Sequence, residues 1–399
     1  MDKKLKFAIV GTGSRGCACF GELLKERKDC IIQALCDKNP KRLQYTAPKF
    51  GKPATYTDLS EMLKKEKLDA VIVTTPDAFH EECAVTVLNH GVNVLIDKPL
   101  ATTVKGCRNI IKAAKKSGKV AMIGFNLRHS PVLLKLKELI DKGELGRVFL
   151  AENREFYEGG RTYMARWNGM KSSSGGLWIH KGSHDFDIFN WLLDFPKPRK
   201  VTAFAGMSVF RPDGFPFPLE KGIKPGPSCS LCHYAKNGVC KDAMAYTAPE
   251  WGPEAQACDG YVKDSCMYLS DLSVHDNGMA MVEYENGVRA SHLECFVTGR
   301  SDRLYTIVGT LGEAILSLSE WKITVLKRWS KEKITYEISQ TEGSHGGADP
   351  GLLESFVESV RGDSVNTSTV EQGLLSTAIG QAAELARAEE RVVFMKELL

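Results

Sequence analysis

The chain has 399 residues, a length that favours two domains. Hydrophobic residues make up 43% of it, charged residues 26%, and the formal net charge is +4. This composition indicates a globular protein with large cores and argues against a nucleic-acid partner. No stretch approaches the ~18 apolar residues of a membrane span, and the apolar run before Gly11 is too short for a signal peptide. Twelve cysteines without such a signal predict reduced thiols and a cytoplasmic location.

Near the N-terminus a strand, a glycine-rich turn, a helix, a second strand and an acid follow one another, in the order that a dinucleotide-binding unit requires. The residues expected to bind the cofactor here are Gly11, Gly13, Ser14, Arg15, Gly16 and Asp37. Gly11 permits the tight turn, Gly13 lets backbone N–H groups approach the pyrophosphate, and Gly16 lets the helix pack on the strand. The alternative is a βα turn that binds no ligand.

Asp37 also bears on which dinucleotide binds. It lies about 20 residues after Gly16, where a carboxylate accepts hydrogen bonds from the ribose hydroxyls and repels a 2′-phosphate. The sequence therefore predicts NAD in preference to NADP. Lys38 and Arg42 follow closely, and both would weaken that preference.

Strand-like and helix-like stretches alternate through the first third of the chain. The strand-like runs cover 69–76, 92–99 and 119–126, and the helix-like stretches cover 77–90 and 103–117. Continuous apolar strands between amphipathic helices predict an α/β fold, with a Rossmann doubly wound parallel sheet over residues 1–126. Its ligands should bind at the carboxyl ends of the strands. At these ends lie the remaining residues of the predicted cofactor site, which are Thr75, Pro76, His80, Asp97, Lys98 and Asn126.

After residue 126 the pattern changes to alternating strands joined by short turns. Strands are predicted over 147–156, 200–210, 278–296, 303–310, 314–319 and 322–329, and helices over 131–142, 350–361 and 370–390. Glu285-Asn286-Gly287 is a hairpin signal inside the third strand. The pattern predicts a C-terminal α+β domain over 127–399 with a large open, mostly antiparallel sheet. Residues 211–266, rich in Pro, Gly and Cys, form an insert in it.

Three stretches resemble the Gfo/Idh/MocA family: the glycine motif, the tripeptide Asp97-Lys98-Pro99, and GGLWIHKGSHDFDIFNWL at 175–192. The resemblance covers nearly the whole chain. It implies an NAD(P)-dependent sugar or polyol oxidoreductase related to glucose–fructose oxidoreductase and inositol dehydrogenase. It also implies that the exposed face of the C-terminal sheet forms a homodimer or homotetramer. The family's Glu-Lys-Pro reads Asp97-Lys98-Pro99 here, which is a conservative departure.

Oxidation of a secondary alcohol needs a group that accepts the hydroxyl proton. Lys98 stands at a strand end near the expected nicotinamide, where desolvation would lower its pKa. The resemblance places the family's catalytic histidine at His184, and His180 replaces the family's aspartate four positions earlier. A helix from residue 179 would put His180, His184 and Asp187 on one face. The alternatives are a surface lysine, histidines with a structural role, and a zinc-binding face.

Further polar and aromatic residues are predicted to line a sugar pocket. Together with the catalytic candidates they are Lys98, Arg128, Arg154, Tyr157, Arg161, Trp167, Lys181 and His184. Arg128 fits the family's G-[FY]-N-x-R pattern, and Trp167 could stack on a pyranose face. Weaker candidates, for which structural roles are at least as plausible, are His275, Asp276 and His345.

Five of the twelve cysteines lie in the insert. Cys229 and Cys232 form a C-x-x-C pair, and two thiolates at that spacing can bind one tetrahedral ion from a single turn. The insert is therefore predicted to hold one structural zinc through Cys229, Cys232, Cys240 and either Cys258 or Cys266, which would order the loop. Free thiols, a redox pair and an iron–sulfur cluster are the alternatives.

These patterns together predict an NAD-dependent oxidoreductase. It would oxidise a secondary hydroxyl of a sugar, glycoside or cyclic polyol by hydride transfer to nicotinamide. Two alternatives remain open: an NAD-dependent glycoside hydrolase that uses transient ring oxidation and elimination, and a non-catalytic NAD-binding regulator. The expected partner is a small carbohydrate or polyol, with neither nucleic acid nor membrane involved.

Overall fold

The computed structural model describes residues 4–244, 252–341 and 347–399. By its contacts the chain divides into two compact units. Unit 1 comprises 1–130, 248–261 and 341–377, and unit 2 comprises 131–247, 262–340 and 378–399. Each unit is thus assembled from separate stretches of the sequence, and a short piece of the Cys-rich insert belongs to unit 1.

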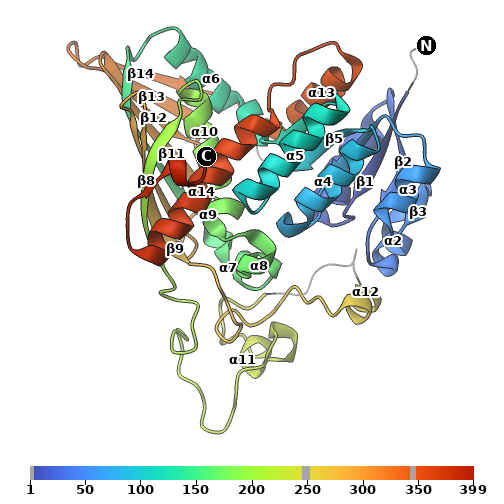
Figure 1. Cartoon of the computed structure of the whole chain (residues 1–399). Coiled ribbons are helices and arrows are strands. Elements are labelled where there is room, and N and C mark those ends of the chain that lie inside the picture. The colour runs from blue at the N-terminus through green and yellow to red at the C-terminus, as the bar shows by residue number, and fades with distance from the viewer. Residues whose placement is uncertain (1–3, 245–251, 342–346) are drawn as a thin grey trace. The chain divides into compact units, whose positions relative to one another are not determined.

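Unit 1 contains a parallel six-stranded sheet with the strand order β3-β2-β1-β4-β5-β6. Its strands are β1 (Leu5–Val10), β2 (Cys30–Cys36), β3 (Ala54–Tyr56), β4 (Ala70–Val73), β5 (Asn93–Asp97) and β6 (Ala121–Gly124). Its helices are α1 (Glu22–Glu26), α2 (Pro40–Thr46), α3 (Leu59–Lys65), α4 (His80–Asn89), α5 (Val104–Ser117), α12 (Gly252–Asp259) and α13 (Ala348–Arg361) (Figure 1). The predicted doubly wound sheet is confirmed.

Both faces of this sheet are buried, which explains its continuous apolar strands. In β1, Ala8 and Val10 belong to one hydrophobic cluster, while Phe7 and Ile9 belong to a second cluster on the other face. All four residues are at most 4% exposed. Because alternate residues of a strand point to opposite faces, a strand covered on both sides has no polar positions.

Unit 2 contains a nine-stranded sheet with the order β14-β13-β12-β11-β7-β10-β9-β8-β15. Its strands are β7 (Val148–Phe156), β8 (Pro198–Gly206), β9 (Asn277–Tyr284), β10 (Arg289–Cys295), β11 (Asp302–Gly309), β12 (Gly312–Ser317), β13 (Lys322–Lys327), β14 (Lys333–Glu337) and β15 (Val393–Phe394). Its helices are α6 (Pro131–Asp141), α7 (Arg161–Met164), α8 (Lys171–Ser174), α9 (Leu177–His180), α10 (Ser183–Leu192), α11 (His233–Lys236) and the part of α14 (Val370–Glu389) from residue 378 on.

All the strand pairs of this second sheet are antiparallel except β7 with β10. The predicted open, mostly antiparallel sheet is therefore confirmed. The hairpin at Glu285-Asn286-Gly287 joins β9 to β10, with Gly287 at φ +83°. Buried and exposed positions alternate along β9 and β10, as expected for a sheet with only one face in the core.

The insert has more apolar packing than its composition suggests. Phe215 stacks on Tyr268 with ring centroids 4.6 Å apart, and Tyr234 is 1% exposed. These rings adjoin a cluster that includes Met164 and Phe296 of unit 2. A metal ion is therefore not the only element that could order this part of the chain.

Candidate functional site

The glycine turn follows β1 and passes close to the end of β4. Gly11 has φ +90°, and a Cβ on it would lie 2.8 Å from the carbonyl group of Thr74. A Cβ on Gly16 would lie 2.0 Å from the Gly11 oxygen. Both positions therefore require glycine. A helical segment begins at Ser14 with no side chain capping its first N–H groups, an arrangement that suits a phosphate.

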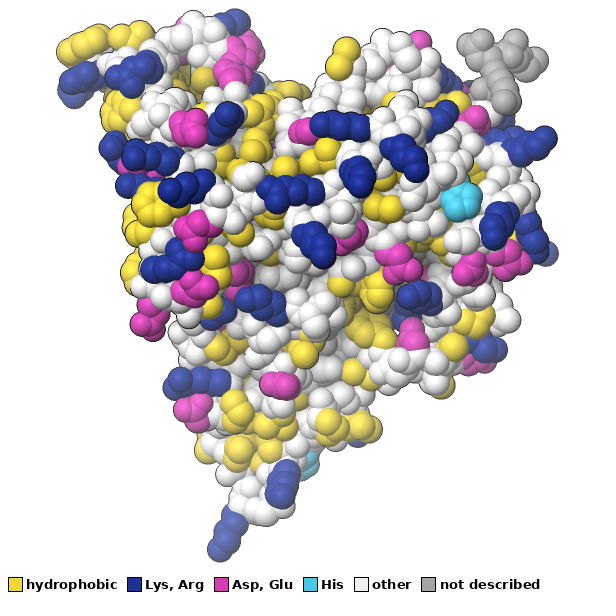
Figure 2. All heavy atoms as spheres, viewed as in Figure 1, with side chains coloured by type: hydrophobic (Ala, Val, Ile, Leu, Met, Phe, Trp, Pro, Cys, Tyr) yellow, Lys and Arg dark blue, Asp and Glu magenta, His cyan; other side chains and the backbone are white. Residues whose placement is uncertain are grey.

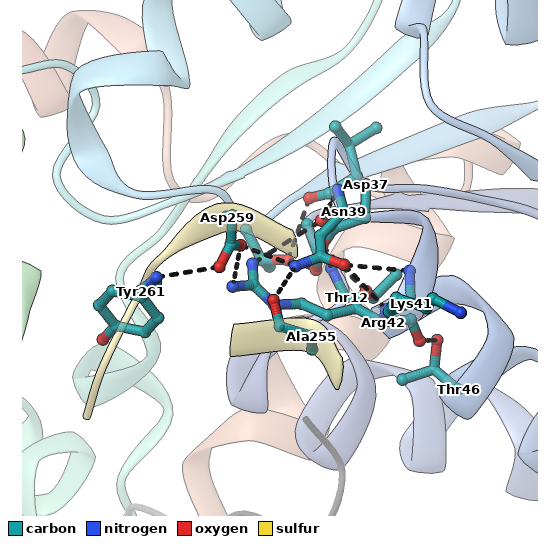
Figure 3. A network of polar contacts seen from close by, with 12 residues as sticks. Thr12, Asp37, Asn39, Lys41, Arg42, Thr46, Ala255, Asp259 and Tyr261 are labelled. Carbon is teal, nitrogen blue, oxygen red and sulfur yellow. Dashed lines mark hydrogen bonds and ion pairs between the residues drawn. The ribbon is translucent and has the colours of Figure 1, made fainter. Parts of the chain in front are cut away.

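Asp37 lies at the end of β2 and is fixed by the chain around it (Figure 3). Its Oδ2 accepts hydrogen bonds from Thr12 N at 2.8 Å and Thr12 Oγ1 at 2.9 Å, and its Oδ1 accepts one from Asn39 N at 2.9 Å. A carboxylate has about four acceptor sites, so acceptor capacity remains for ribose hydroxyls. The carboxylate is therefore oriented before any cofactor binds.

Arg15 has a different environment from the one its place in the motif suggests. Its Nε lies 3.1 Å from Asp97 Oδ2, and its Nη1 lies 3.0 Å from Asp349 Oδ1. Burial would lower the pKa of Arg15, but the two carboxylates outweigh it and raise the pKa. The guanidinium thus joins the end of β5 to the start of α13.

Asn126 shares a partner with Arg15, because its Nδ2 donates to Asp349 Oδ1 at 2.8 Å. Its Oδ1 is buried, and no group of the described residues hydrogen-bonds it. Buried polar atoms are nearly always paired in folded proteins. An acceptor left open at a strand end fits a ligand that offers a donor, such as the carboxamide of nicotinamide. The residues present in unit 1 therefore fit a dinucleotide.

Lys98 follows β5 directly and is half-buried. Asp77, which is 3% exposed, is close enough to interact with it electrostatically. Burial raises the pKa of the Asp77 carboxyl, and the charges of His80 and Lys98 act in the opposite direction. Asp77 and Asp349 were not predicted from the sequence. Asp77 directly follows Pro76 at a strand end, which was an available signal, whereas Asp349 lies far along the chain.

His80 and Arg128 have protein partners where ligand contacts were predicted. The two ring nitrogens of His80 lie 2.7 Å from Pro99 O and 3.0 Å from Thr75 O, so the ring links two strand ends. Arg128 Nη1 donates to Thr367 O and Gln372 Oε1, both at 2.8 Å. These contacts support positioning roles for both side chains.

In unit 2 the predicted continuous helix from residue 179 is wrong. Helix α9 ends at His180 and α10 begins at Ser183. A Cβ on Gly182 would lie 2.8 Å from Trp178 O, so the chain turns tightly there. His180 and His184 are both 6% exposed. The break therefore interrupts the helix spacing between His180 and His184, whereas His184 and Asp187 both lie in α10.

His180 lies in an aromatic environment. Its Nε2 is 2.9 Å from Asn168 Nδ2, and its ring meets Tyr163 and Trp167 edge-on, with centroids 5.4 Å and 5.3 Å away. Trp167, predicted to stack on a sugar, thus has one protein ring beside it already. The half-buried Tyr157 is the next aromatic, with its ring 5.5 Å from Tyr163.

Lys181 belongs to a buried network of four charges in unit 2. Its Nζ lies 3.1 Å from Glu155 Oε1 and 4.3 Å from the centre of the Tyr157 ring. Arg303 pairs with Glu155 and with Asp185, the latter at 3.1 Å. Burial would lower the pKa of Lys181, but Glu155 outweighs it and raises the pKa. Lys181 therefore stays a paired ammonium and is not suited to accept a proton.

The remaining sugar-pocket candidates lie nearer the surface. Arg154 Nε is 3.2 Å from Glu152 Oε1, and the exposed Arg161 donates to Lys241 O at 3.2 Å. Of the weaker candidates, Asp276 accepts backbone N–H groups from three consecutive residues that begin at Ser208. His275 pairs with the buried Glu294. His345 lies outside the described residues.

The cysteines of the insert are free thiols. Cys229, Cys232, Cys240 and Cys266 belong to unit 2, whereas Cys258 belongs to unit 1 and is exposed. In the described parts of the chain, no three His, Cys, Asp or Glu side chains are arranged to hold a metal ion. The zinc site stays a prediction, and Cys266 is the better candidate for its fourth ligand.

Fold and site together define an oxidoreductase with an NAD-binding Rossmann domain. The Gfo/Idh/MocA model described as "Oxidoreductase family, NAD-binding Rossmann fold" matches residues 5–125, and the model described as "Oxidoreductase family, C-terminal alpha/beta domain" matches 137–395. The chain therefore belongs to the Gfo/Idh/MocA family of oxidoreductases. The predicted family resemblance is confirmed.

Individual relatives agree with this assignment. YteT of Bacillus subtilis (strain 168) is 30% identical over 98% of this chain and 97% of its own length. The D-glucoside 3-dehydrogenase of Escherichia coli (strain K12) is 29% identical over 51% of this chain and 58% of its own length. The structure of a levoglucosan dehydrogenase in complex with NADH and levoglucosan has a TM-score of 0.74 at 18% identity, covering 98% of this chain and 100% of that one; it shows the shared fold. Among the described residues, no helix is long and apolar enough to cross a membrane.

Proposed function

We propose that this protein is an NAD-dependent dehydrogenase that oxidises a secondary hydroxyl of a sugar, glycoside or cyclic polyol. The observation that carries the proposal is the corner at the end of β2, where Thr12 and Asn39 orient Asp37 for a ribose diol. Relatives named for glucoside and inositol oxidation support the substrate class.

The residues of the chain have separate tasks in this reaction. When bound, NAD supplies the hydride acceptor. Asp37 binds the adenosine ribose, and the open acceptor of Asn126 orients the nicotinamide end. As the neutral amine, Lys98 accepts the proton of the reacting hydroxyl, and the charge of the nearby, buried Asp77 stabilises the ammonium that forms. His184 is the proposed acid–base group of unit 2.

A substrate panel tests this function. Inositols, aldoses, uronates, aryl glycosides and hydroxy acids are offered with NAD, and NADH absorbance and aryl release are recorded in parallel. We expect NADH to accumulate with at least one cyclic polyol or sugar. Aryl release without NADH would instead identify a redox-neutral glycosidase, and faster oxidation of lactate or malate than of every cyclic substrate would refute the pocket assignment.

We also propose that the outer face of the second sheet mediates self-association. Phe204 and Met279, directly opposite each other in the β8–β9 register, are 67% and 50% exposed, and Met281 is 51% exposed. Figure 2 shows hydrophobic side chains among Lys and Arg on the left of the view, over this sheet. Exposed apolar clusters of this kind mark interfaces. Light scattering should show a dimer or tetramer, and Phe204→Lys should weaken it.

For the insert we propose a zinc bound by Cys229, Cys232, Cys240 and Cys266. Ser228 and Ser265 pair as an antiparallel bridge, which brings the segments before Cys229 and Cys266 together. Burial raises the pKa of the Cys229 thiol, and the nearby Cys266 and Cys232 raise it further. Binding requires these thiols to reorient and lose their protons. Elemental analysis finding less than about a tenth of an equivalent, in protein purified without chelator, would refute the site.

A further inference from the structure

Helix α12 contributes an acidic side chain to the ribose-binding corner of unit 1 (Figure 3). Asp259, at the end of α12, accepts a hydrogen bond from Arg42 Nη2 at 2.5 Å and from Asn39 Nδ2 at 2.8 Å through the same oxygen. Arg42 and Asn39 lie at the start of α2, more than two hundred residues earlier in the sequence. The insert therefore reaches the corner that Asp37 defines.

Asn39 helps to hold Asp259 next to Arg42. It caps α2 by accepting from Lys41 N and Arg42 N, and its Nδ2 donates to Ala255 O at 2.8 Å as well as to Asp259. Asn39 is 2% exposed, so its amide is held by four hydrogen bonds in a buried position. The other oxygen of Asp259 accepts from Tyr261 N at 3.0 Å. The Asp259 carboxylate is thus held in place where it meets Arg42.

Arg42 is the residue whose charge matters for cofactor choice. Its Nη1 lies 3.8 Å from Asp37 Oδ1, so the guanidinium stands beside the carboxylate expected to bind the ribose. An arginine at that place is the usual partner of the 2′-phosphate in NADP sites. Here Asp259 and Asp37 flank the guanidinium, and the three charges sum to −1. That local charge disfavours a phosphate.

We propose that Asp259 is a positioning residue for cofactor selection, which binds Arg42 and withholds its charge from the 2′-phosphate of NADP. This inference rests on the proposed NAD site. It assigns the insert a role in discriminating between the two dinucleotides, because a second discriminating carboxylate, in addition to Asp37, comes from α12.

The test compares Asp259→Asn with Glu254→Gln. Asparagine carries no charge, and its single carbonyl oxygen can keep one of the two hydrogen bonds, from Asn39 Nδ2 or from Tyr261 N, so Arg42 loses its charged partner on α12. Glu254 lies on the same helix and pairs with Lys41 at 3.4 Å, with its side chain 75% exposed, so its substitution removes the same charge without touching Arg42. Titration calorimetry on the full-length protein gives Kd for NAD and for NADP, and thermal unfolding reports folding.

We expect Asp259→Asn to tighten NADP binding relative to NAD by about 2- to 5-fold, the size typical of one partly exposed charge interaction. Glu254→Gln should leave the ratio unchanged. Adding Arg42→Gln to Asp259→Asn should return the ratio toward the wild-type value. If Asp259→Asn weakens both cofactors equally, Asp259 only docks α12 and the inference is refuted.

Two further results distinguish a failure of this inference from a failure of the proposed function. If the unmodified protein binds neither dinucleotide, the proposed function fails. If Asp259→Asn does not fold, Arg42→Gln alone decides: with Arg42 withheld by Asp259, its loss should change NADP affinity by less than about 3-fold. A larger loss would mean that Arg42 already serves the phosphate and that Asp259 withholds nothing.

Discussion

Replacing Asp37 by Ser should shift the cofactor preference from NAD toward NADP. The wild-type carboxylate is oriented by Thr12 and Asn39, and a hydrogen bond to a charged group contributes about 1.5–3 kcal/mol. Losing one such bond to the ribose weakens NAD binding by about 10- to 100-fold, since 1.4 kcal/mol corresponds to tenfold. NADP gains from the loss of repulsion at its 2′-phosphate, so the ratio of the two Kd values should change by at least about 10-fold.

Calorimetric Kd values for both dinucleotides measure this ratio. Thr12→Val is the matched control, because it removes the 2.9 Å hydrogen bond from Thr12 Oγ1 but leaves the charge of Asp37 intact. It should lower thermal stability slightly and keep the NAD preference. Tighter binding of NADP than of NAD by the unmodified protein would contradict this expectation, and so would an equal loss of both affinities in Asp37→Ser.

Three further predictions concern catalysis and stability. Lys98→Ala and His184→Ala should each lower turnover by about 10²–10⁴-fold with nearly unchanged NAD affinity; full activity in either variant would remove that residue from the mechanism. Gly16→Ala should lower the melting temperature and reduce the free energy of unfolding by about 1–3 kcal/mol or more, because the added Cβ would lie 2.0 Å from the Gly11 oxygen. Burial would lower the pKa of His292, but the hydrogen bond to Glu294 raises that pKa above 6.5. The protonated His292 therefore stabilises the fold fully below pH 6.5, and this stabilisation is lost as the pH rises through the raised pKa. Melting temperatures from about pH 5 to about pH 8 should show this loss in the wild type and not in His292→Gln.

Much of the fold could be predicted because the apolar residues of the local sequence pattern are the residues that the structure buries. The apolar run before Asp97 became β5, and the hairpin signal at 285–287 joins β9 to β10. Strands β3 and β14 were not predicted. β3 has three residues, and no residue of β14 is buried, so neither has the apolar pattern from which a strand can be recognised. The break between α9 and α10 was also missed, because the close approach of Gly182 to Trp178 O is a packing event with no periodic signal.

The candidate site was predictable only where its residues are close together in sequence. The glycine turn and Asp37 belong to one short βαβ stretch whose spacing is diagnostic. Asp349, in contrast, pairs with Arg15 from more than three hundred residues away. Such contacts depend on how distant segments pack, and no spacing rule reports them. The charges of these partners nevertheless affect Arg15, since two carboxylates offset the charge of its guanidinium before any phosphate binds.

The corner at the end of β2 also depends on contacts between residues that are distant in sequence. The sequence placed Arg42 next to the ribose site and suggested that it would soften the preference for NAD. The structure places it against Asp259 and near Asp37, so its charge is offset before a cofactor arrives. A 2′-phosphate would have to compete with two carboxylates for one guanidinium. We therefore propose that selectivity for NAD depends on the partners that Arg42 already has, more than on the presence of an arginine after the second strand.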